Sequence, residues 1–598
     1  MLMRYNKAQL VALSVGLVGV ITSSYLMSQQ RFWSYLPLGL FLATWTIIVS
    51  LCKKLLWSDD SKIKYLIYST LSAIILSLGF PPLPLAPFMF VAFVPLMIAS
   101  DEIEKSERKN RTLIQWTYAY HTFLVWNICT TFWVANSALI PAVAAFTLNS
   151  LFMTIPWMAA IWTGRFFSKL RWLSLPVFWM SWEYIHLNWE ISWPWLSIGN
   201  SFASNVRWIQ WYEFTGIFGG ALWIWLINVL LFFWIKNKSN ISQKSDFPKR
   251  VLYPIAILCS ILIPLLISLY IFHHYEEKGR SKKVLIVQSN YEPHYQKFEV
   301  DEDLQFNKCM QLLEPYLADS GQLVIFPETS FGNSLPFELT ALEEDNRLHQ
   351  WRQMIVDSNH RSLLSGITAK RQYFPGEVPG PSARESRRRP GHYYEISNAA
   401  LLALPESSAY YNKSRLVPGA EIFPYRKILP FLKPIVDMLG GSIEGFARQS
   451  QRTVFNEGDC KIAPVICYES IYGEFLAGFI RNGAEAFCIL TNDGWWDDTP
   501  GYKQHLMIGA LRAIEFRRDI ARAANTGISC TIDQRGIVHH ALAYDTEGVV
   551  AAEIQLNDEH SLYSFTGDVI AHIAMAASAI FLILCLWKAL RFRLKKRN

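Results

Sequence analysis

The chain has 598 residues, of which 51% are hydrophobic, and it carries a formal net charge of +7. The length allows several domains, and the hydrophobic residues gather into runs of about 20, the length that a helix needs to cross a bilayer. Much of the positive charge lies in short connections between these runs and in the tail from Arg591 to Arg597, where it indicates a cytoplasmic membrane face. We therefore predict a polytopic membrane protein, and the charge gives no reason to expect a nucleic-acid partner.

Ten apolar segments are expected to form membrane-spanning helices. If the N-terminus lies in the cytoplasm and the spans alternate, the short outside connections carry only Arg31 and Arg207, whereas the inside connections carry many lysines and arginines, Lys244 among them. The positive-inside rule therefore places both termini in the cytoplasm and the long segment 273–568 outside. The first segment lacks a signal-peptide cleavage site and is expected to be retained. The segments are 8–27, 35–52, 65–80, 85–100, 115–134, 138–163, 172–187, 217–235, 251–272 and 569–590.

Two of the outside connections have unusual compositions. Residues 80–84, Phe-Pro-Pro-Leu-Pro, follow the third span, and their prolines stop a helix at the membrane surface. The stretch from Trp189 to Trp211 follows the seventh span and is rich in tryptophan. Tryptophans in such a place are typical of an interfacial aromatic belt, but they could equally line a face through which lipids enter.

The segment 273–568 has the pattern of an external α/β domain, whereas residues 1–272 and 569–598 form the membrane part. Residues 505–524 are expected to form an amphipathic helix. Residues 374–391, which are rich in Pro, Gly and Arg, are expected to form a mobile loop or an insertion. Short apolar runs predict buried strands at 284–288, 323–326, 363–367, 399–404, 462–466 and 486–490.

The cysteines give no indication of a metal site. Nine cysteines occur without a CxxC pair and without histidines at metal-ligand spacing. The external segment has an odd number of them, so at least one thiol stays free unless it pairs between chains, and the sequence leaves any pairing among the others open. The external cysteines are Cys309, Cys460, Cys467, Cys488 and Cys530.

Three residues at the ends of predicted strands have side chains suited to acyl transfer. Cys467 follows a strand-like run and precedes a possible helix start, where backbone N–H groups favour a thiolate and an oxyanion. Glu328 follows an apolar run and could act as a general base for a thiol. Lys413 is a charge beside an apolar run and could stabilise an oxyanion. Singly, each is more often a structural cysteine or a surface charge, but together they supply a nucleophile, a base and an electrophile.

The segments that contain these residues resemble the nitrilase superfamily, and within it the chain looks most like the membrane-embedded apolipoprotein N-acyltransferases. Membrane segments flank the external domain, and Glu421 follows Lys413 by eight residues. The resemblance covers roughly residue 65 to the end. The similar segments are Phe326-Pro327-Glu328-Thr329, Tyr411-Asn412-Lys413, Ile466-Cys467-Tyr468-Glu469, Thr491-Asn492-Asp493-Gly494-Trp495-Trp496, Gln504-His505 and Pro194-Trp195.

This resemblance implies an αββα sandwich on a membrane bundle and a ping-pong acyl transfer on the external side of a bacterial inner membrane. The implied donor is a phospholipid, and the implied acceptor is the α-amino group of the diacylglyceryl-cysteine of an apolipoprotein. No metal or cofactor is implied, because an ester already carries an activated acyl group. The implied roles are general base for Glu328, support of the tetrahedral intermediate for Lys413, acylation for Cys467, and substrate binding or support for Glu421, Tyr468 and Glu469.

Two features depart from the family pattern. The segments 8–27 and 35–52 are additional to the usual eight spans, and Asp497-Asp498 stands where a glycine is expected. Two other functions remain open. One is an amidase of the nitrilase type that passes the same thioester to water, and the other is a membrane receptor or scaffold with a degenerate nitrilase fold. The presence of all three triad residues argues against the scaffold.

Overall fold

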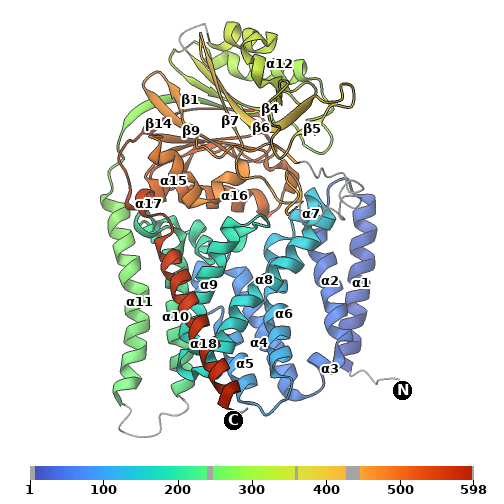
Figure 1. Cartoon of the computed structure of the whole chain (residues 1–598), viewed down its shortest axis with the longest axis vertical. Helices are drawn as coiled ribbons and strands as arrows, with labels where there is room; N and C mark the ends of the chain where they lie inside the picture. Colours follow the sequence, from blue (N-terminus) through green and yellow to red (C-terminus); the bar gives the residue numbers. More distant parts are fainter. Residues whose placement is uncertain (1–6, 239–246, 319, 357–360, 426–444, 596–598) are drawn as a thin grey trace.

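The computed structural model describes residues 7–238, 247–318, 320–356, 361–425 and 445–595. A bundle of long helices carries an α/β sandwich at one of its ends (Figure 1). The sandwich is formed by residues between α11 (Phe247–His274) and α18 (Val569–Lys595), two long helices of the bundle. The start of α1 (Lys7–Gln29) and the end of α18 lie at the other end of the bundle, away from the sandwich.

Each of the ten predicted apolar segments forms a helix. Six of them are long and apolar enough to cross a membrane by length and composition. The segment predicted at 85–100 is divided, because a 3-10 helix, Ala86–Phe90, precedes α5. Lys244, Lys596 and Arg597 lie outside the described residues. The other helices of the bundle are α2 (Leu36–Leu51), α4 (Asp60–Leu78), α5 (Val94–Lys105), α6 (Arg111–Thr131), α8 (Leu139–Phe166), α9 (Arg171–Asn188) and α10 (Tyr212–Lys238).

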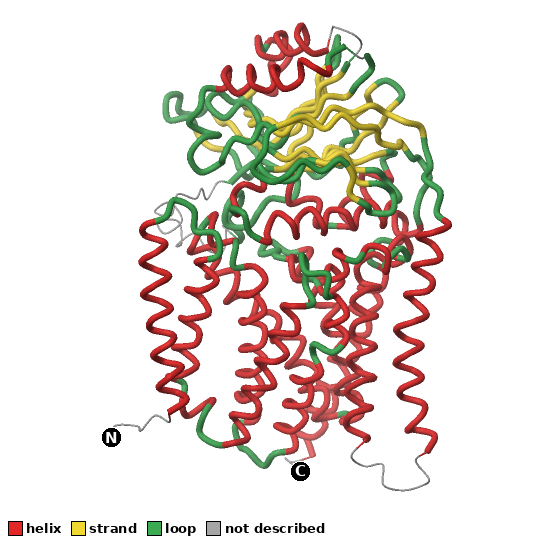
Figure 2. Tube along the Cα trace, turned by 180° about the vertical axis from the view of Figure 1, so that it is seen from behind, coloured by secondary structure: helices red, strands yellow, loops and turns green. Residues whose placement is uncertain are grey.

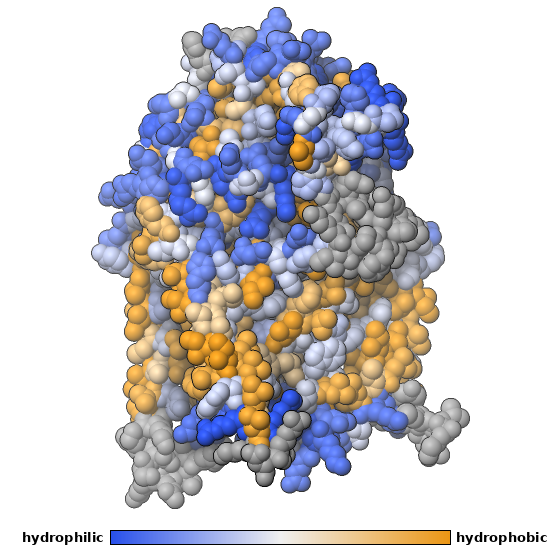
Figure 3. Space-filling model, in the orientation of Figure 1, coloured by the Kyte–Doolittle hydropathy of each residue, from blue (hydrophilic) through white to orange (hydrophobic). Residues whose placement is uncertain are grey.

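The surface of the bundle has the polarity of a membrane protein. Large apolar side chains are exposed along α1, α11 and α18, including Val15, Leu266 and Ile583. Figure 3 shows the exposed apolar residues as a band across the visible face of the helices, with polar residues on the sandwich and at the opposite end of the bundle. Exposed apolar surface of this extent is stable in hydrocarbon and unfavourable in water. The chain is therefore a multi-pass membrane protein.

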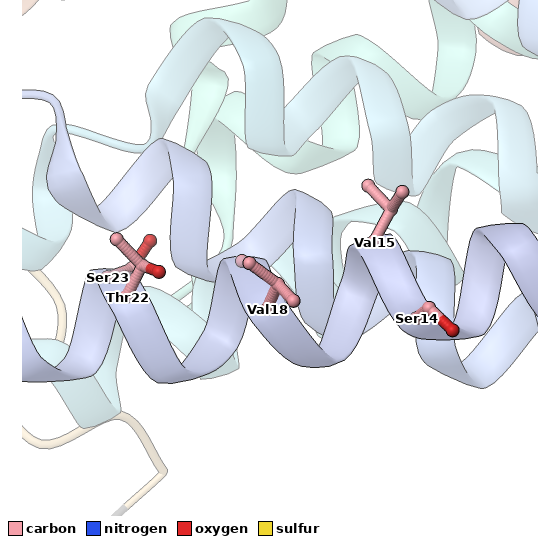
Figure 4. Close-up of a pocket in the computed structure, with 6 residues that line it drawn as sticks. Ser14, Val15, Val18, Thr22 and Ser23 are labelled. Carbon is pink, nitrogen blue, oxygen red and sulfur yellow. The ribbon is translucent and has the colours of Figure 1, made fainter.

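The two N-terminal helices, α1 and α2, pair through small residues. A Cβ atom at Gly16 would lie 2.6 Å from Ile47, and one at Gly19 would lie 2.8 Å from Ala43, so glycine allows α1 and α2 to approach closely. α2 in turn packs against α6 and α8. Beside this contact, α1 carries an open groove that is shown in Figure 4 and lined by Ser14, Val15, Val18, Gly19, Thr22 and Ser23.

The sandwich contains two mixed β-sheets. In the first, β1, β2 and β4 run parallel, and in the second, β9, β10 and β11 run parallel. The first sheet has the order β14 (Gly548–Leu556), β1 (Arg280–Gln288), β2 (Leu323–Ile325), β4 (Ser362–Gln372), β6 (Tyr393–Ala403), β5 (Arg384–Glu385), with β3 (Phe337–Glu338) beside β4 and β7 (Ser408–Asn412) beside β6. The second has the order β13 (Val538–His539), β12 (Cys530–Ile532), β11 (Ile520–Ala524), β10 (Ala486–Thr491), β9 (Cys460–Ile466), β8 (Phe455–Glu457).

Side chains of the central strands alternate between the two faces of the first sheet. Leu285 and Val287 of β1 pack against α12 (Glu302–Leu313), whereas Val284 and Ile286 belong to the core that the two sheets share. The second sheet is covered on its other side by α15 (Gly473–Arg481) and α16 (Pro500–Phe516). Helices, two sheets and helices form four layers, as Figure 2 shows, which confirms the predicted αββα sandwich.

The helix predicted at 505–524 is shorter than expected. α16 ends at Phe516, because Arg517 adopts a left-handed conformation with a φ of 51°. Residues 520–524 form β11 and pair with β10. Arg522 in this strand is fully buried, so its charge does not mark a solvent-exposed helix face. The sequence of β11 resembles part of an amphipathic helix because a charge such as that of Arg522 is typical of a solvent-exposed face.

The predicted mobile loop at 374–391 is fastened to the first sheet. It contains β5, which pairs with Tyr393 and Tyr394 of β6. Glu395 of β6 accepts hydrogen bonds from Ser382 Oγ at 2.7 Å and from Tyr373 OH at 2.6 Å. The segment is therefore an insertion that is tied to the first sheet, one of the two alternatives that its composition left open.

Gln504 on α16 joins the sandwich to the bundle. Its side-chain oxygen accepts hydrogen bonds from the indole N–H groups of Trp133 at 3.1 Å and Trp195 at 2.7 Å. Its side-chain nitrogen donates to the backbone oxygens of Pro81 at 2.8 Å and Thr130 at 3.1 Å. Trp195 is 1% exposed, so at this residue the tryptophan-rich stretch is an interface with the sandwich and not an aromatic belt.

Candidate active site

Glu328 lies three residues after β2, where the chain turns next to β4. Gly366 of β4 makes room for this turn, since a Cβ atom there would lie 2.6 Å from Glu328 Cα. The Glu328 side chain is 8% exposed. Its Oε1 accepts hydrogen bonds from Lys413 Nζ at 2.9 Å and from Asn398 Nδ2 at 2.7 Å. The carboxylate is therefore held from two sides in a buried position.

Lys413 lies directly after β7 and is shared by two carboxylates. Its Nζ lies 2.9 Å from Glu328 Oε1 and 2.8 Å from Glu421 Oε1, and its side chain is 1% exposed. Glu421 also accepts hydrogen bonds from Val417 N at 2.9 Å and from Asn398 Nδ2 at 3.1 Å. One buried cation thus stands between two anions in a single hydrogen-bonded group.

Cys467 is the first residue of a short 3-10 helix, Cys467–Ile471, at the carboxyl end of β9. Its φ of 49° lies in the left-handed region, which costs a non-glycine residue about 1–3 kcal/mol. Neighbouring contacts offset this strain, because Ser470 Oγ donates to Cys467 O at 2.8 Å and Glu469 Oε2 accepts from Ile466 N at 2.9 Å. A sharp turn of this kind presents a nucleophile at the edge of a sheet.

The two residues after this cysteine support the site in different directions. Glu469 is fully buried, and its Oε1 accepts hydrogen bonds from Tyr411 OH and Ser414 N, both at 2.7 Å. It therefore ties the cysteine turn to the segment that carries the lysine. Tyr468 reaches toward the bundle, where its hydroxyl donates to Ser192 O at 2.9 Å.

The charges of the site set the protonation states of its three central side chains. Burial raises the pKa of Glu328, but Lys413 outweighs it and holds that pKa below its ordinary value. Burial likewise opposes the charge of Lys413, but Glu328 and Glu421 raise its pKa well above the ordinary range. Burial and the charge of Glu328 raise the pKa of the Cys467 thiol, against the effect of Lys413. These directions favour a carboxylate at Glu328, an ammonium at Lys413 and a neutral thiol at Cys467 in the resting site, so the thiol needs a general base, the role predicted for Glu328.

A buried hydrogen-bonded network lies behind Cys467. Asp493 Oδ1 lies 2.9 Å from His505 Nδ1, and Arg522 donates to Asp493 Oδ2 at 2.5 Å. The other ring nitrogen of His505 lies 3.2 Å from Cys467 O and 3.0 Å from Ser470 Oγ. Asp493, His505 and Arg522 are fully buried. Their hydrogen bonds fix the His505 ring, which in turn holds the carbonyl of Cys467 in place.

Lys297 is a second buried lysine at the site. It is 2% exposed, and its Nζ donates to Glu328 O at 2.6 Å and to Thr329 Oγ1 at 3.0 Å. Thr329 has a φ of 45°, so the lysine fastens a left-handed turn directly after the carboxylate. Burial lowers the pKa of Lys297 to about 8, although Glu328 and Cys467 act in the opposite direction. The lysine therefore remains mainly protonated at pH 7.

The structure brings the residues singled out by the sequence analysis into one place. Three of them share hydrogen bonds, and the thiol is close enough for the charges of Glu328 and Lys413 to affect its pKa. The central residues are Glu328, Lys413, Glu421 and Cys467, and the turn behind them contains Tyr468 and Glu469.

Two residues of the site were missed by the sequence analysis. Asn398 carries a signal that could have been used, because it is a polar residue within the apolar strand β6 and bonds both carboxylates. Lys297 carries none, because its segment contains neither strand nor helix and the residue resembles an ordinary surface charge.

The other cysteines take no part in this arrangement. All nine cysteines are free thiols. Burial raises the pKa of Cys460 to about 11 and that of Cys309 to about 12, as it also raises the pKa of Cys467, so exposure and not the pKa distinguishes the nucleophile from these thiols. Among the five cysteines of the sandwich only Cys467 is partly exposed; Cys309, Cys460, Cys488 and Cys530 are buried.

Two family models match the chain. The model described as "Apolipoprotein N-acyltransferase N-terminal domain" matches residues 72–230, which run from α4 to α10. The model described as "Carbon-nitrogen hydrolase" matches residues 284–563, which run from β1 to α17 (Leu562–Thr566). The second range contains Glu328, Lys413 and Cys467, whereas α1 and α2 precede both ranges.

Curated relatives match most of the chain. Apolipoprotein N-acyltransferase of Chlorobaculum tepidum is 28% identical over 526 residues, which cover 85% of this chain and 94% of the relative. That of Geobacter metallireducens is 26% identical over 531 residues, which cover 86% and 93%. Among solved structures, an amidase from Nesterenkonia sp. has a TM-score of 0.32 and 16% identity, and covers 50% of this chain and 97% of its own.

We expect Lys297→Met to lower the reactivity of the thiol. The substitution removes the donor to Glu328 O and Thr329 Oγ1 and a positive charge near Cys467, so the carboxylate loses its fixed position and the thiol ionises less readily. Alkylation of Cys467 by iodoacetamide, followed by mass spectrometry, should slow by about tenfold or more. Lys308→Met, at a partly exposed lysine paired with Glu547, is the control. Equal alkylation rates in both variants would remove Lys297 from the site.

Proposed function

Because the chain belongs to the apolipoprotein N-acyltransferase family, we propose that it transfers an acyl chain from a phospholipid to the N-terminal amine of a lipoprotein through a thioester on Cys467. One observation carries the proposal: Lys413 lies between Glu328 and Glu421 beside the thiol. This arrangement supplies a base, a cation and a nucleophile at one edge of the sandwich.

In the first half-reaction, the sulfur of Cys467 attacks the sn-1 ester carbonyl of the phospholipid. Glu328 takes the thiol proton as the sulfur–carbon bond forms, and Lys413 stabilises the negative charge on the carbonyl oxygen. The tetrahedral intermediate then breaks the ester bond, and Glu328 returns the proton to the departing oxygen. The products are a thioester and a lysophospholipid.

In the second half-reaction, the α-amino group of a diacylglyceryl-cysteine attacks the thioester. Glu328 takes a proton from the amine, and Lys413 stabilises the second tetrahedral intermediate. The carbon–sulfur bond then breaks, the sulfur of Cys467 recovers the proton, and an amide remains on the lipoprotein. Neither half-reaction needs a metal or a cofactor, because the ester and the thioester both hold an activated acyl group.

A membrane setting suits both proposed substrates. Each keeps its apolar chains in the bilayer and presents its reacting atoms at the surface, where lateral diffusion brings it to the enzyme. The sandwich rests on the bundle through Gln504, and Tyr468, next to the nucleophile, is bonded to Ser192 in the tryptophan-rich stretch. The site therefore lies where the bundle ends and the sandwich begins.

We also propose that the sandwich faces outward from the inner membrane and that both ends of the chain lie in the cytoplasm. The connections at the end of the bundle opposite the sandwich are rich in basic residues, such as Lys53 and Arg165, whereas the short connections on the sandwich side carry only Arg31 and Arg207. Lysines and arginines are enriched in cytoplasmic connections.

Incubation of the purified protein with phospholipid alone should add one acyl group, measured by intact-protein mass spectrometry. Cys467→Ser should show no adduct, because a hydroxyl is far less ionised than a thiol. Cys460→Ser, at a buried cysteine outside the site, should be acylated like the wild type. Addition of a diacylglyceryl peptide should then yield the N-acyl peptide. Release of labelled chains as free fatty acid would instead identify water as the acceptor and contradict the proposal.

Glu328→Gln and Lys413→Met should both slow the acylation of Cys467, but for different reasons. Glu328→Gln removes the base, so the thiol stays protonated and no acyl-enzyme accumulates. Lys413→Met removes the charge that stabilises both tetrahedral intermediates and should cost about 2.7–4 kcal/mol or more, which is roughly a hundred- to a thousandfold in rate. Single-turnover acylation of Cys467 measures both. Rapid thioester formation in Glu328→Gln, or normal acylation in Lys413→Met, would refute the role of that residue.

Topology reporters test the proposed orientation. A reporter inserted near residue 380, in the loop fastened by β5, should be active outside the cytoplasm, and one fused after residue 598 should report the cytoplasm. Labelling of a cysteine introduced at the exposed position Glu406 by a membrane-impermeant reagent in intact spheroplasts provides an independent measurement. Cytoplasmic activity of the reporter near residue 380 would overturn the orientation.

A further inference from the structure

One carboxylate joins the connection between α1 and α2 to the sandwich. Asp497 Oδ2 accepts hydrogen bonds from the backbone N–H groups of Trp33 at 3.1 Å and Ser34 at 3.0 Å. The aspartate is 7% exposed, so these bonds are largely shielded from water. Both helices precede the residues matched by either family model. The joint therefore links an additional part of the bundle to the loop that follows β10.

The backbone of Asp497 explains why the aspartate and the connection belong together. Its φ of 53° lies in the left-handed region, where glycine is favoured. An aspartate pays a conformational cost at this position. The two N–H groups of the connection offset it, because they give the buried carboxylate hydrogen bonds that a glycine would not need. The left-handed aspartate and the α1–α2 connection therefore form one feature of the structure.

Asn136 adds a second set of bonds to the same joint. It lies in α7 (Val134–Ser137), at the sandwich end of the bundle. Its Nδ2 donates to Ser34 O at 3.1 Å and to Trp496 O at 3.2 Å, and its backbone oxygen lies 3.2 Å from His294 Nε2. One side chain therefore bonds the α1–α2 connection and the residue that precedes Asp497.

The connection also contacts the segment that contains Lys297. Tyr295 OH donates to Arg31 O at 3.1 Å, and the Arg31 guanidinium lies 3.8 Å from the centre of the Tyr295 ring. Phe32 packs edge-on against the same ring at 5.9 Å. Two residues further on, Lys297 donates to Glu328 O. The connection thus holds one segment that leads to the proposed base.

The other side of the joint leads to the nucleophile. Trp496, next to Asp497, packs against the ring of His505 with centroids 5.6 Å apart. His505 Nε2 lies 3.2 Å from Cys467 O. A shift of this loop therefore reaches the turn that carries the thiol through two contacts.

We propose that the α1–α2 connection, residues 30–35, is a positioning element of the active site and that Asp497 is the residue through which it acts. The connection fixes the segments 291–297 and 493–498 against each other, so Glu328 and Cys467 keep their relative positions in both half-reactions. The proposal rests on the proposed function for its kinetic readout, but the joint itself can be measured without any substrate.

Hydrogen exchange tests the joint in the full-length protein. Asp497→Gly keeps a residue that accepts the left-handed backbone and removes only the carboxylate. Amides of residues 31–35 and 495–498 should exchange faster in this variant than in the wild type. The control is Asp545→Gly, because Asp545 also has a positive φ of 58° but lies in an exposed turn. Unchanged exchange at both segments in Asp497→Gly would overturn the proposal, whatever the substrate of the enzyme.

Kinetics then separates positioning from folding. In Asp497→Gly, single-turnover acylation of Cys467 and transfer to a diacylglyceryl peptide should both slow by about ten- to a hundredfold, with an unchanged KM for phospholipid and an unchanged unfolding temperature. Asn136→Ala should slow the rates less than additively in the Asp497→Gly background, because both act on one joint. Wild-type rates in Asp497→Gly, or a fall equal to that of Asp545→Gly, would contradict the proposal. A wild-type protein without acyl transfer would instead refute the proposed function.

Discussion

The ion group formed by Lys413 with Glu328 and Glu421 is the interaction on which the site depends. Its charges are almost completely removed from water, so each needs the others, and loss of one partner from such a group costs about 3–5 kcal/mol. The group also joins three separate parts of the first sheet: the end of β2, the end of β7 and, through Asn398, the middle of β6. The same ion group therefore holds the ends of these strands together and sets the protonation states of the site.

The fold was largely predictable because its signals are local. An apolar run of sufficient length forms a helix in the membrane whatever its neighbours are, and short apolar runs became buried strands of both sheets. The failures occurred where distant contacts decided the structure. Residues 520–524 became a strand because β10 lies beside them. Distant contacts also decided between the two alternatives for residues 374–391, because Glu395 of β6 bonds this insertion to the first sheet.

The site was predictable in part. Glu328, Lys413 and Cys467 follow strands, and the resemblance gave them roles. Lys297 could not be found, because its partner is a backbone oxygen 31 positions away. The meaning of Asp497 was hidden for the same reason, since its donors lie more than 460 positions earlier in the chain. The role of an unexpected residue such as Asp497 can therefore be interpreted only when the structure shows which residues bond to it.

The protonation states also determine how the proposed proton transfer must proceed. The pKa of Glu328 is held below its ordinary value and that of Cys467 is raised, so a thiolate with a neutral Glu328 is a rare state before the substrate arrives. If the reaction required a thiolate formed before the substrate binds, most encounters with the substrate would be unproductive. If the proton moves to Glu328 while sulfur bonds to the carbonyl carbon, the negative charge develops on the oxygen instead, where Lys413 can stabilise it. The same burial that suppresses the thiolate then strengthens this stabilisation, because Lys413 acts in a medium of low dielectric constant. A neutral thiol is therefore consistent with catalysis, provided that the base and the cation keep fixed positions around it.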